Sequence, residues 1–332
     1  MATPDRKSEH LRIAAEADVG HVGPTGLGRI RLRHRALPER DLADVSLRTT
    51  VLGRTLEAPL VVSAMTGGTA EAALLNGRLL EAAAEHGLGL VLGSGRPLLD
   101  DPSLLKTYVP GTARPPLLLA NLGSSHVRGT GGPDRATRLV ELLDADGLCL
   151  HLNPLQEAIQ PEGDTALAAV LGGIRATVTR LAPRPVVVKE VGFGLAGADV
   201  AALRDAGVAA VDVAGAGGTN WALVEGFRDD RAARLAAPFA DWGLSTTEAL
   251  EEATAAAPGL PVIASGGLRD GVECAKCLAL GAVLAGMARP LLLAARADRA
   301  TEVLGTVVAQ IRIATWLTGA ASTADLAKEH VR

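Results

Sequence analysis

Aromatic residues make up only 2% of this chain of 332 residues, and cysteine is rarer still, with three. An odd number of thiols in a long chain argues against a disulfide framework and favours a reducing cytoplasm. Cys274 and Cys277 form a C-x-x-C within a helical pattern. Because no further thiol or His pair lies near them in the sequence, we interpret them as neighbours on a helix surface. A zinc or redox site is not expected there.

A strong net charge and long hydrophobic runs are also missing. The net charge is −4, so the chain lacks the basic field that non-specific nucleic-acid binding requires. The longest apolar runs are interrupted, at Asp212 and at Arg289-Pro290, before they reach the roughly 20 residues of a membrane-spanning helix. The first ten residues are polar and charged, unlike a signal peptide. We expect a cytoplasmic protein that binds neither nucleic acid nor membrane.

Short aliphatic runs alternate with helical patterns along most of the chain. Such alternation implies a parallel sheet, and eight repeats imply a closed (β/α)8 TIM barrel. Residues 58–332 would form this barrel with C-terminal helices over 291–317, and residues 1–57 an N-terminal extension that covers its mouth. The predicted strands are 58–65, 89–94, 116–122, 147–153, 185–191, 209–215, 260–267 and 282–288. The predicted helices are 70–86, 102–108 (brief), 134–143, 166–181, 198–206, 246–256 and 272–280.

The segment His151 to Glu157, HLNPLQE, follows the apolar run 147–150 with several polar side chains. Packing does not explain them, because buried polar groups cost free energy unless they are hydrogen-bonded. In a (β/α)8 barrel the chemistry belongs at the carboxyl ends of the strands. We therefore predict an active site there, and an enzyme.

Glycine follows three neighbouring strands, in the segments 214–219, 265–267 and 286–289. Glycine lets backbone N–H groups approach phosphate oxygens closely, so these loops favour a bound phosphate group. Lys189 ends the aliphatic run 186–188. It is either a core lysine paired with Glu190 or the partner of an electron-rich ring such as a reduced flavin, and we favour the second interpretation.

These motifs resemble the type 2 isopentenyl diphosphate isomerases, FMN-dependent (β/α)8 enzymes that interconvert isopentenyl and dimethylallyl diphosphate. HLNPLQE and VKEVGFG together are specific to that family. The resemblance extends over nearly the whole chain, in RKSEH at 6–10, HRALPE at 34–39, SAMTGGT at 63–69, LANLG at 119–123, HLNPLQEA at 151–158, VKEVGFG at 188–194, DVAGAGGTNW at 212–221, PFADWG at 238–243, ASGGLRDG at 264–271 and GMARP at 286–290.

The resemblance implies a role for each matching residue. The isoalloxazine of FMN would lie against Ala64, Met65, Thr66, Ser94, Asn121 and Lys189. The ribityl phosphate would be held by Thr219, Gly266, Gly267, Leu268, Ala288 and Arg289. The substrate would contact Arg6, Lys7, His10, Ser94, Arg96 and Gln156, with Glu157 binding Mg²⁺ between the diphosphate oxygens.

The implied chemistry moves a double bond by adding one proton and removing another, with no net redox change. Gln156 would lie near the allylic carbon within a polar network of His151 and Asn153, while Lys189 stabilises the reduced ring. A neutral Gln is a poor general acid, so the flavin would do most of the proton transfer. The family resemblance further implies NADPH as reductant and a homo-oligomer, a tetramer or octamer.

Two positions depart from the family pattern on the substrate side. Gly95 stands where members have Gln, which removes a polar contact and bulk and would suit a longer substrate. His126 stands near a position at which family members commonly have Gln, and it lies in a glycine-rich loop. Three alternatives therefore stay open. They are a paralogue acting on a different or longer prenyl diphosphate, an FMN-dependent 2-hydroxy-acid oxidoreductase, and a flavin-binding protein without turnover.

Overall fold

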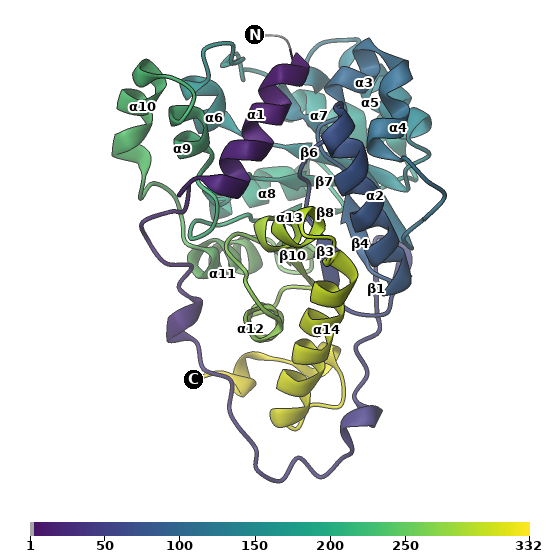
Figure 1. The fold of residues 1–332 in the computed structure, drawn as a ribbon. Helices are drawn as coiled ribbons and strands as arrows, with labels where there is room; N and C mark the ends of the chain where they lie inside the picture. The colour runs from purple at the N-terminus through teal and green to yellow at the C-terminus, as the bar shows by residue number, and fades with distance from the viewer. Residues whose placement is uncertain (1–2) are drawn as a thin grey trace.

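Eight parallel strands close into a barrel in the computed structural model, which describes the backbone of residues 3–332 and the side chains from residue 6 onward (Figure 1). The strands run in the order β10-β3-β4-β5-β6-β7-β8-β9 around the barrel, and every neighbouring pair is parallel. All eight predicted strands and the (β/α)8 fold are confirmed. Their bounds are β3 Leu60–Val62, β4 Gly89–Val91, β5 Leu117–Gly123, β6 Gly147–His151, β7 Val186–Lys189, β8 Ala210–Asp212, β9 Val262–Ala264 and β10 Leu284–Met287.

Each strand buries both faces, which explains why the runs are aliphatic throughout instead of alternating with polar residues. One face packs inside the barrel, where Val61, Leu119 and Val187 meet in a single cluster. The antiparallel hairpin of β1 (Thr49–Val51) and β2 (Arg54–Leu56) adds Val51 and Leu56 to that cluster. Because the hairpin directly precedes β3, it closes the amino-terminal end of the barrel and leaves the carboxyl end open.

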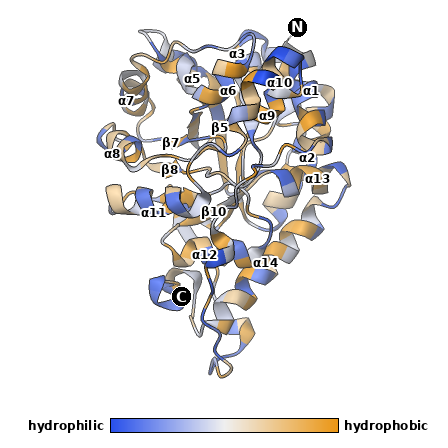
Figure 2. Ribbon diagram, turned by 90° about the vertical axis from the view of Figure 1, so that its left-hand side faces the viewer, coloured by the Kyte–Doolittle hydropathy of each residue, from blue (hydrophilic) through white to orange (hydrophobic). Residues whose placement is uncertain are grey.

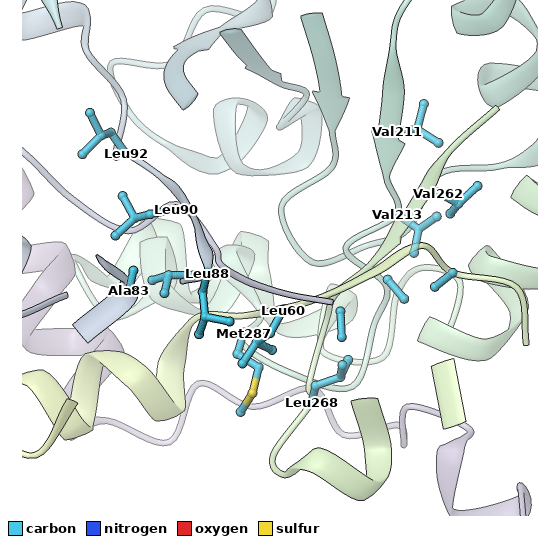
Figure 3. Close-up of a cluster of buried hydrophobic side chains, with 14 of the residues drawn as sticks. Leu60, Ala83, Leu88, Leu90, Leu92, Val211, Val213, Val262, Leu268 and Met287 are labelled. Atoms are coloured by element: carbon cyan, nitrogen blue, oxygen red, sulfur yellow. The ribbon is translucent and has the colours of Figure 1, made fainter. Parts of the chain in front are cut away.

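The outward faces of the strands pack against the helices in a second, larger cluster. Figure 3 shows a part of it, in which Leu60 lies beside Leu88 and Met287, while Val262 lies with Val211 and Val213 on the right of the view. Figure 2 shows the matching pattern on the helices, which combine hydrophobic and hydrophilic residues. This amphipathic composition is the expected one for helices that cover a barrel on one side and face water on the other.

The helices predicted from periodicity are all present. The α-helices are α1 Thr3–Glu16, α2 Ala70–Glu85, α3 Arg96–Asp100, α4 Leu105–Tyr108, α5 Gly132–Leu142, α6 Pro154–Ile159, α7 Val170–Leu181, α8 Gly197–Asp205, α9 Trp221–Gly226, α10 Asp230–Ala236, α11 Thr246–Ala256, α12 Gly271–Ala279, α13 Arg289–Arg296 and α14 Ala300–Leu317. Short 3-10 helices are η1 Leu27–Arg29, η2 Leu42–Asp44, η3 Pro102–Leu104, η4 Ser124–Val127, η5 Ala237–Phe239, η6 Thr323–Asp325 and η7 Lys328–His330. Periodicity missed α1, α3, α6, α9 and α10, most of which are too short to show a repeat.

One interpretation of the cysteines was wrong. Cys274 and Cys277 are fully buried on α12, with the Sγ of Cys274 4.0 Å from the Sδ of Met287. All three cysteines are free thiols. Burial raises the pKa of Cys277 to about 12, so this thiol stays protonated and behaves as a small apolar side chain.

The N-terminal segment crosses the open end of the barrel. In Figure 1, α1 lies over the strands with α9 to one side, and it contacts both α9 and α13. Further along, residues 31–33 run beside the C-terminus, where Leu32 forms an isolated bridge with Val331. Within residues 3–332, no helix combines the length and apolarity needed to cross a membrane.

Candidate active site

A cavity of about 650 Å³ lies at the carboxyl ends of the strands, beneath α1. Every site residue predicted from the sequence lines it. These residues are Arg6, Lys7, His10, Ala64, Met65, Thr66, Ser94, Arg96, Asn121, His151, Asn153, Gln156, Glu157, Lys189, Thr219, Gly266, Gly267, Leu268, Ala288 and Arg289. They come from all parts of the chain, so the barrel closure is what brings them together.

The floor of the cavity follows from the two-residue period of the strands. Cys149 and Val187 point into the barrel, so His151 and Lys189, two residues further on, point the same way. In the strand register His151 is paired with Lys189, and Lys189 with Asp212. Three adjacent strands thus present a row of polar side chains at the level where the aliphatic interior ends.

His151 is held as a neutral ring. Its Nδ1 lies 2.9 Å from Oδ1 of Asn121, an atom that only accepts hydrogen bonds, so Nδ1 has the proton and Nε2 is left as an acceptor. Burial, together with the positive charge of Lys189 and the proximity of His126, lowers the pKa of His151 to about 3. His151 therefore offers an acceptor, and no acidic proton, near neutral pH.

Lys189 is 8% exposed, and its ammonium group forms no ion pair with the Glu190 carboxylate. Its Nζ donates to the backbone carbonyl oxygen of Glu190 instead. The Glu190 carboxylate turns away and accepts the N–H groups of Val191, Gly192 and Phe193 at 2.5, 2.6 and 2.5 Å. Burial raises the pKa of Glu190 to about 7, although the hydrogen bonds from those three N–H groups act to lower it. Lys189 lines the cavity, and among residues 6–332 it forms no ion pair with a carboxylate.

The loops after β8 and β9 touch backbone to backbone. A Cβ placed on Gly266, at φ +104°, would lie 2.0 Å from the carbonyl oxygen of Gly215, and one on Gly218 would lie 2.4 Å from the amide nitrogen of Gly267. Only glycine permits this approach. The contact places exposed backbone of both loops against the cavity, an arrangement typical of a phosphate site.

The side chain of Arg289 is engaged by the end of α1. Its Nε donates to the carbonyl oxygen of Ala14 at 2.8 Å, and its Nη2 to that of Ala17 at 3.4 Å. The guanidinium thus caps the C-terminal end of α1, which has no basic residue of its own in its last turn. Any phosphate contact of residue 289 would come from its backbone at the start of α13.

The predicted catalytic segment forms a hydrogen-bonded unit at the start of α6. The Nδ2 of Asn153 donates to Oε1 of Gln156 at 3.1 Å and to Oε1 of Glu157 at 2.9 Å. The other carboxylate oxygen of Glu157 accepts the backbone N–H of Asp164 at 2.7 Å. Glu157 pairs with no Arg or Lys among residues 6–332, so its charge is free to face a cation in the cavity.

Sequence reasoning missed Glu225, which is fully buried on α9. Its Oε1 accepts from Nε2 of Gln156 at 2.8 Å and lies 3.0 Å from Nε2 of His10, and its Oε2 pairs with Nη1 of Arg228 at 2.8 Å. Burial would raise the pKa of Glu225, yet these partners together hold the pKa below its usual value. The signal in the sequence is weak, since Glu225 is a lone acid in the apolar stretch 221–226.

The expectation attached to Gly95 was wrong. A Cβ at this position would lie 2.5 Å from Cδ1 of the buried Leu139 on α5, and Gly95 is not part of the cavity wall. The space left by the missing side chain is filled by Leu139 and is not available to a longer substrate. His126, in contrast, does line the cavity. Burial and the charges of Arg96 and Arg135 lower its pKa.

Comparisons with known proteins bear on this site. Residues 174–332 match the family model of FMN-dependent dehydrogenases. The chain is 47% identical to an isopentenyl-diphosphate delta-isomerase of Xanthobacter autotrophicus over 95% of this chain and 94% of the relative. It is 45% identical to an isopentenyl-diphosphate delta-isomerase of Nostoc sp. over 98% of this chain and 94% of the relative.

The chain belongs to the type 2 isopentenyl-diphosphate delta-isomerase family. It is accordingly an FMN-dependent isomerase. Among solved structures, a mandelate oxidase mutant with benzaldehyde superposes with a TM-score of 0.69 at 21% identity, covering 99% of this chain and 96% of that one. At such low identity the likeness shows the shared barrel fold alone, so it adds no support to the 2-hydroxy-acid oxidoreductase alternative.

Proposed function

We propose that this isomerase interconverts isopentenyl diphosphate and dimethylallyl diphosphate, using reduced FMN and Mg²⁺. The observation that supports this most is the composition of one cavity. Glycine loops suited to the FMN phosphate follow β8 and β9, and Arg6 and Lys7 of α1 line the same cavity beside a Gln–Glu–His cluster. Relatives named for this activity match nearly the full chain.

The residues present fit FMN. Gly218 and Gly267 line the cavity with backbones so close that a Cβ on Gly218 would lie 2.4 Å from the amide nitrogen of Gly267, and Lys189 offers a cation that forms no ion pair within residues 6–332. Lys189 would face the ring, and the loops at 217–219, 266–268 and 288–289 would hold the phosphate. When bound, reduced FMN supplies a proton-exchanging N5 and an electron-rich face for positive charge on a tertiary carbon.

Three side chains of this chain, Gln156, His10 and Glu225, would orient the allylic carbon of the substrate. Gln156 is fixed on both sides, since its Oε1 accepts from Asn153 and its Nε2 donates to Glu225. Its amide plane therefore has one orientation toward the cavity. His10 lies on the other side of the same carboxylate, 3.0 Å away, with its ring edge-on to Trp221 at 5.6 Å. In this proposal the buried negative charge of Glu225 would lie near the carbon that becomes positive and would lower the barrier.

The site also fits Mg²⁺ held mainly by substrate. Within residues 6–332 no three His, Cys, Asp or Glu gather as a metal-binding group. Glu157 is one unpaired carboxylate at the cavity, and Mg²⁺ is commonly bound by one or two carboxylates together with substrate phosphates. Arg6 and Arg96, which line the same part of the wall, would neutralise the remaining diphosphate charge.

This assignment predicts the effect of Glu157→Gln. The amide can still accept a hydrogen bond, but it has no charge for the cation, so we expect the Mg²⁺ concentration at half-maximal rate to rise about tenfold. FMN content should be unchanged. Glu162→Gln serves as control, because that carboxylate is already paired with Arg228 and Arg6. An equal shift in both variants would contradict a specific metal role for Glu157.

The deciding experiment is anaerobic incubation of the purified protein with FMN, Mg²⁺ and dithionite or NADPH, on isopentenyl diphosphate in D₂O. We expect dimethylallyl diphosphate that contains deuterium, formed only when the flavin is reduced. Tight FMN binding without turnover would reject the proposal for this substrate. Longer prenyl diphosphates would then be tested, with attention to the wall at His126.

The remaining parts of the proposal rest on the sequence and the family resemblance. We propose NADPH as the physiological reductant, a homo-oligomer of four or eight chains, and a reducing cytoplasm as the location. The free thiols support the last point. Mass measurement of the holoenzyme in solution tests the oligomeric state, and the rate of flavin reduction by NADPH against NADH tests the reductant.

A further inference from the structure

Tyr108 is the only tyrosine of the chain and is completely buried at the end of α4. It does not line the cavity. Its hydroxyl donates to the carbonyl oxygen of Ser94 at 2.8 Å, and its ring packs so closely on Gly67 that a Cβ there would lie 2.0 Å from Cε1. Tyr108 therefore lies directly behind the two loops, after β3 and β4, that form the wall of the cavity.

The same hydroxyl accepts a hydrogen bond from Lys7 of α1. The Nζ of Lys7 lies 3.1 Å from the Tyr108 oxygen, 2.8 Å from the carbonyl oxygen of Gly67 and 2.8 Å from that of Ser94. It also lies 5.4 Å from the centre of the Tyr108 ring. An ammonium group has three protons, and here three protein oxygens accept them. No proton is left for a direct bond to a substrate diphosphate while this arrangement holds.

Among the side chains that the structure describes, Lys7 forms no ion pair with a carboxylate, and three oxygens and the aromatic ring surround its ammonium group. Burial, with the charge of Arg6 next to it, lowers the pKa of Lys7 to about 7. The phenol is suited to the contact, because burial raises the pKa of Tyr108 and keeps the hydroxyl proton in place for Ser94. One lone pair of the oxygen is then free to accept from Lys7.

The wall on which Lys7 docks is itself held rigid from behind. The hydroxyl of Thr107 accepts the N–H of Gly68 at 2.9 Å, and Nδ2 of Asn76 bridges the carbonyl oxygens of Thr66 and Thr107 at 3.2 and 2.8 Å. These bonds tie α4 to the loop that follows β3. If α1 moved away from the cavity, this wall would stay in place and the contacts of Lys7 with it would break.

We propose that Tyr108 is a positioning residue: it fixes Lys7, and through Lys7 the helix α1, in the closed position over the cavity. Lys7 then acts as the latch of the lid. The effect on substrate binding rests on the proposed function, whereas closure of α1 does not depend on it.

The test compares FMN-loaded wild type with Tyr108→Phe by amide hydrogen exchange of residues 6–16. Phe keeps the ring and removes the oxygen, so we expect exchange in α1 to become about tenfold faster, as for the loss of one hydrogen bond to a charged group. The KM for isopentenyl diphosphate should rise by a similar factor, with kcat changed less than twofold. Unchanged exchange in α1 would overturn the proposal.

A double-mutant cycle separates positioning from a structural effect. If Tyr108 acts through Lys7, then adding Tyr108→Phe to Lys7→Met should change neither exchange nor KM further. Full additivity would overturn the proposal. Thr315→Val is the matched control, since it also removes a buried hydroxyl that donates to a carbonyl, that of Ile311 at 2.9 Å on α14. Equal loosening of α1 by this control would mean global destabilisation and would also overturn it.

Failure of the proposed function remains distinguishable from failure of the latch. Exchange is measured without substrate, so faster exchange of α1 in Tyr108→Phe together with no isomerisation by wild type would leave the latch standing and reject the substrate. Isomerisation by wild type together with unchanged exchange of α1 in Tyr108→Phe would support the substrate and reject the latch.

Discussion

The two halves of the cavity are built in different ways. Around β8 and β9 the wall is mainly backbone, brought together by Gly218, Gly266 and Gly267. Between α1, α6 and α9 it is a network of side chains that includes His10, Gln156 and Glu225. A backbone wall recognises a phosphate by shape and tolerates no added atom. A side-chain wall can be adjusted one group at a time, which suits the part of a site that determines the substrate.

This contrast predicts its largest effect for Gly266→Ala. The new methyl group would overlap the carbonyl oxygen of Gly215, so the two loops would have to separate, and we expect FMN affinity to fall by roughly 100-fold or more. Fluorescence titration of the apoprotein with FMN measures it. The control is Gly259→Ala, at φ +86° with open space around it, which has similar backbone strain but no clash. Equal losses in both would mean that strain, and not loop contact, limits FMN binding.

Glu225→Gln should have a smaller effect of another kind. The fold and FMN content should be retained, because the cofactor half lies elsewhere, while kcat falls roughly 50-fold as the buried charge beside His10 and Gln156 is lost. Steady-state kinetics with thermal unfolding as a parallel check measures this. Glu9→Gln is the comparison, because Glu9 pairs with the same Arg228 at 3.1 Å without touching Gln156. A drop in FMN content with unchanged kcat would contradict the division into two halves.

The smallest expected effect concerns pH and His151. Its pKa is lowered to about 3 in the folded protein, against 6.5 for an ordinary exposed histidine, so the unfolded state binds more protons between these limits. Folding stability should therefore fall as pH drops from about 6.5 toward 3, with a His151 share of roughly 1–2 kcal/mol at pH 5. Denaturant unfolding of His151→Gln at pH 7 and pH 5 should show a correspondingly smaller loss than wild type. An identical loss would mean that His151 does not titrate as its burial predicts.

Much of the cofactor half could be predicted from the sequence, because its signals are local. A glycine pair after an aliphatic run indicates close backbone approach wherever the strand ends, and Lys189 is conspicuous at the end of a buried strand. The polar segment 151–157 was recognisable for the same reason. The contacts of the Arg289 side chain were not foreseen, since its acceptors Ala14 and Ala17 lie at the end of a helix that periodicity did not predict.

The substrate half was predicted only where motifs of the family matched. Glu225 and Tyr108 lie in no recognised motif, and their partners are far away in the sequence: Gln156 for the first, Lys7 and Ser94 for the second. Gly95 shows the reverse error, in which an absent side chain suggested room for substrate although Leu139 fills the space.

By itself, the sequence determined the eightfold alternation of strand and helix, the burial of both strand faces and the end of the barrel at which polar residues gather. These follow from hydrophobic periodicity, which acts over a few neighbouring residues. The tertiary structure alone decided which polar atoms meet: Lys7 with Tyr108, Gln156 with Glu225, Arg289 with the end of α1. Such contacts depend on distances set by barrel closure and by the path of α1, and no local pattern records those distances.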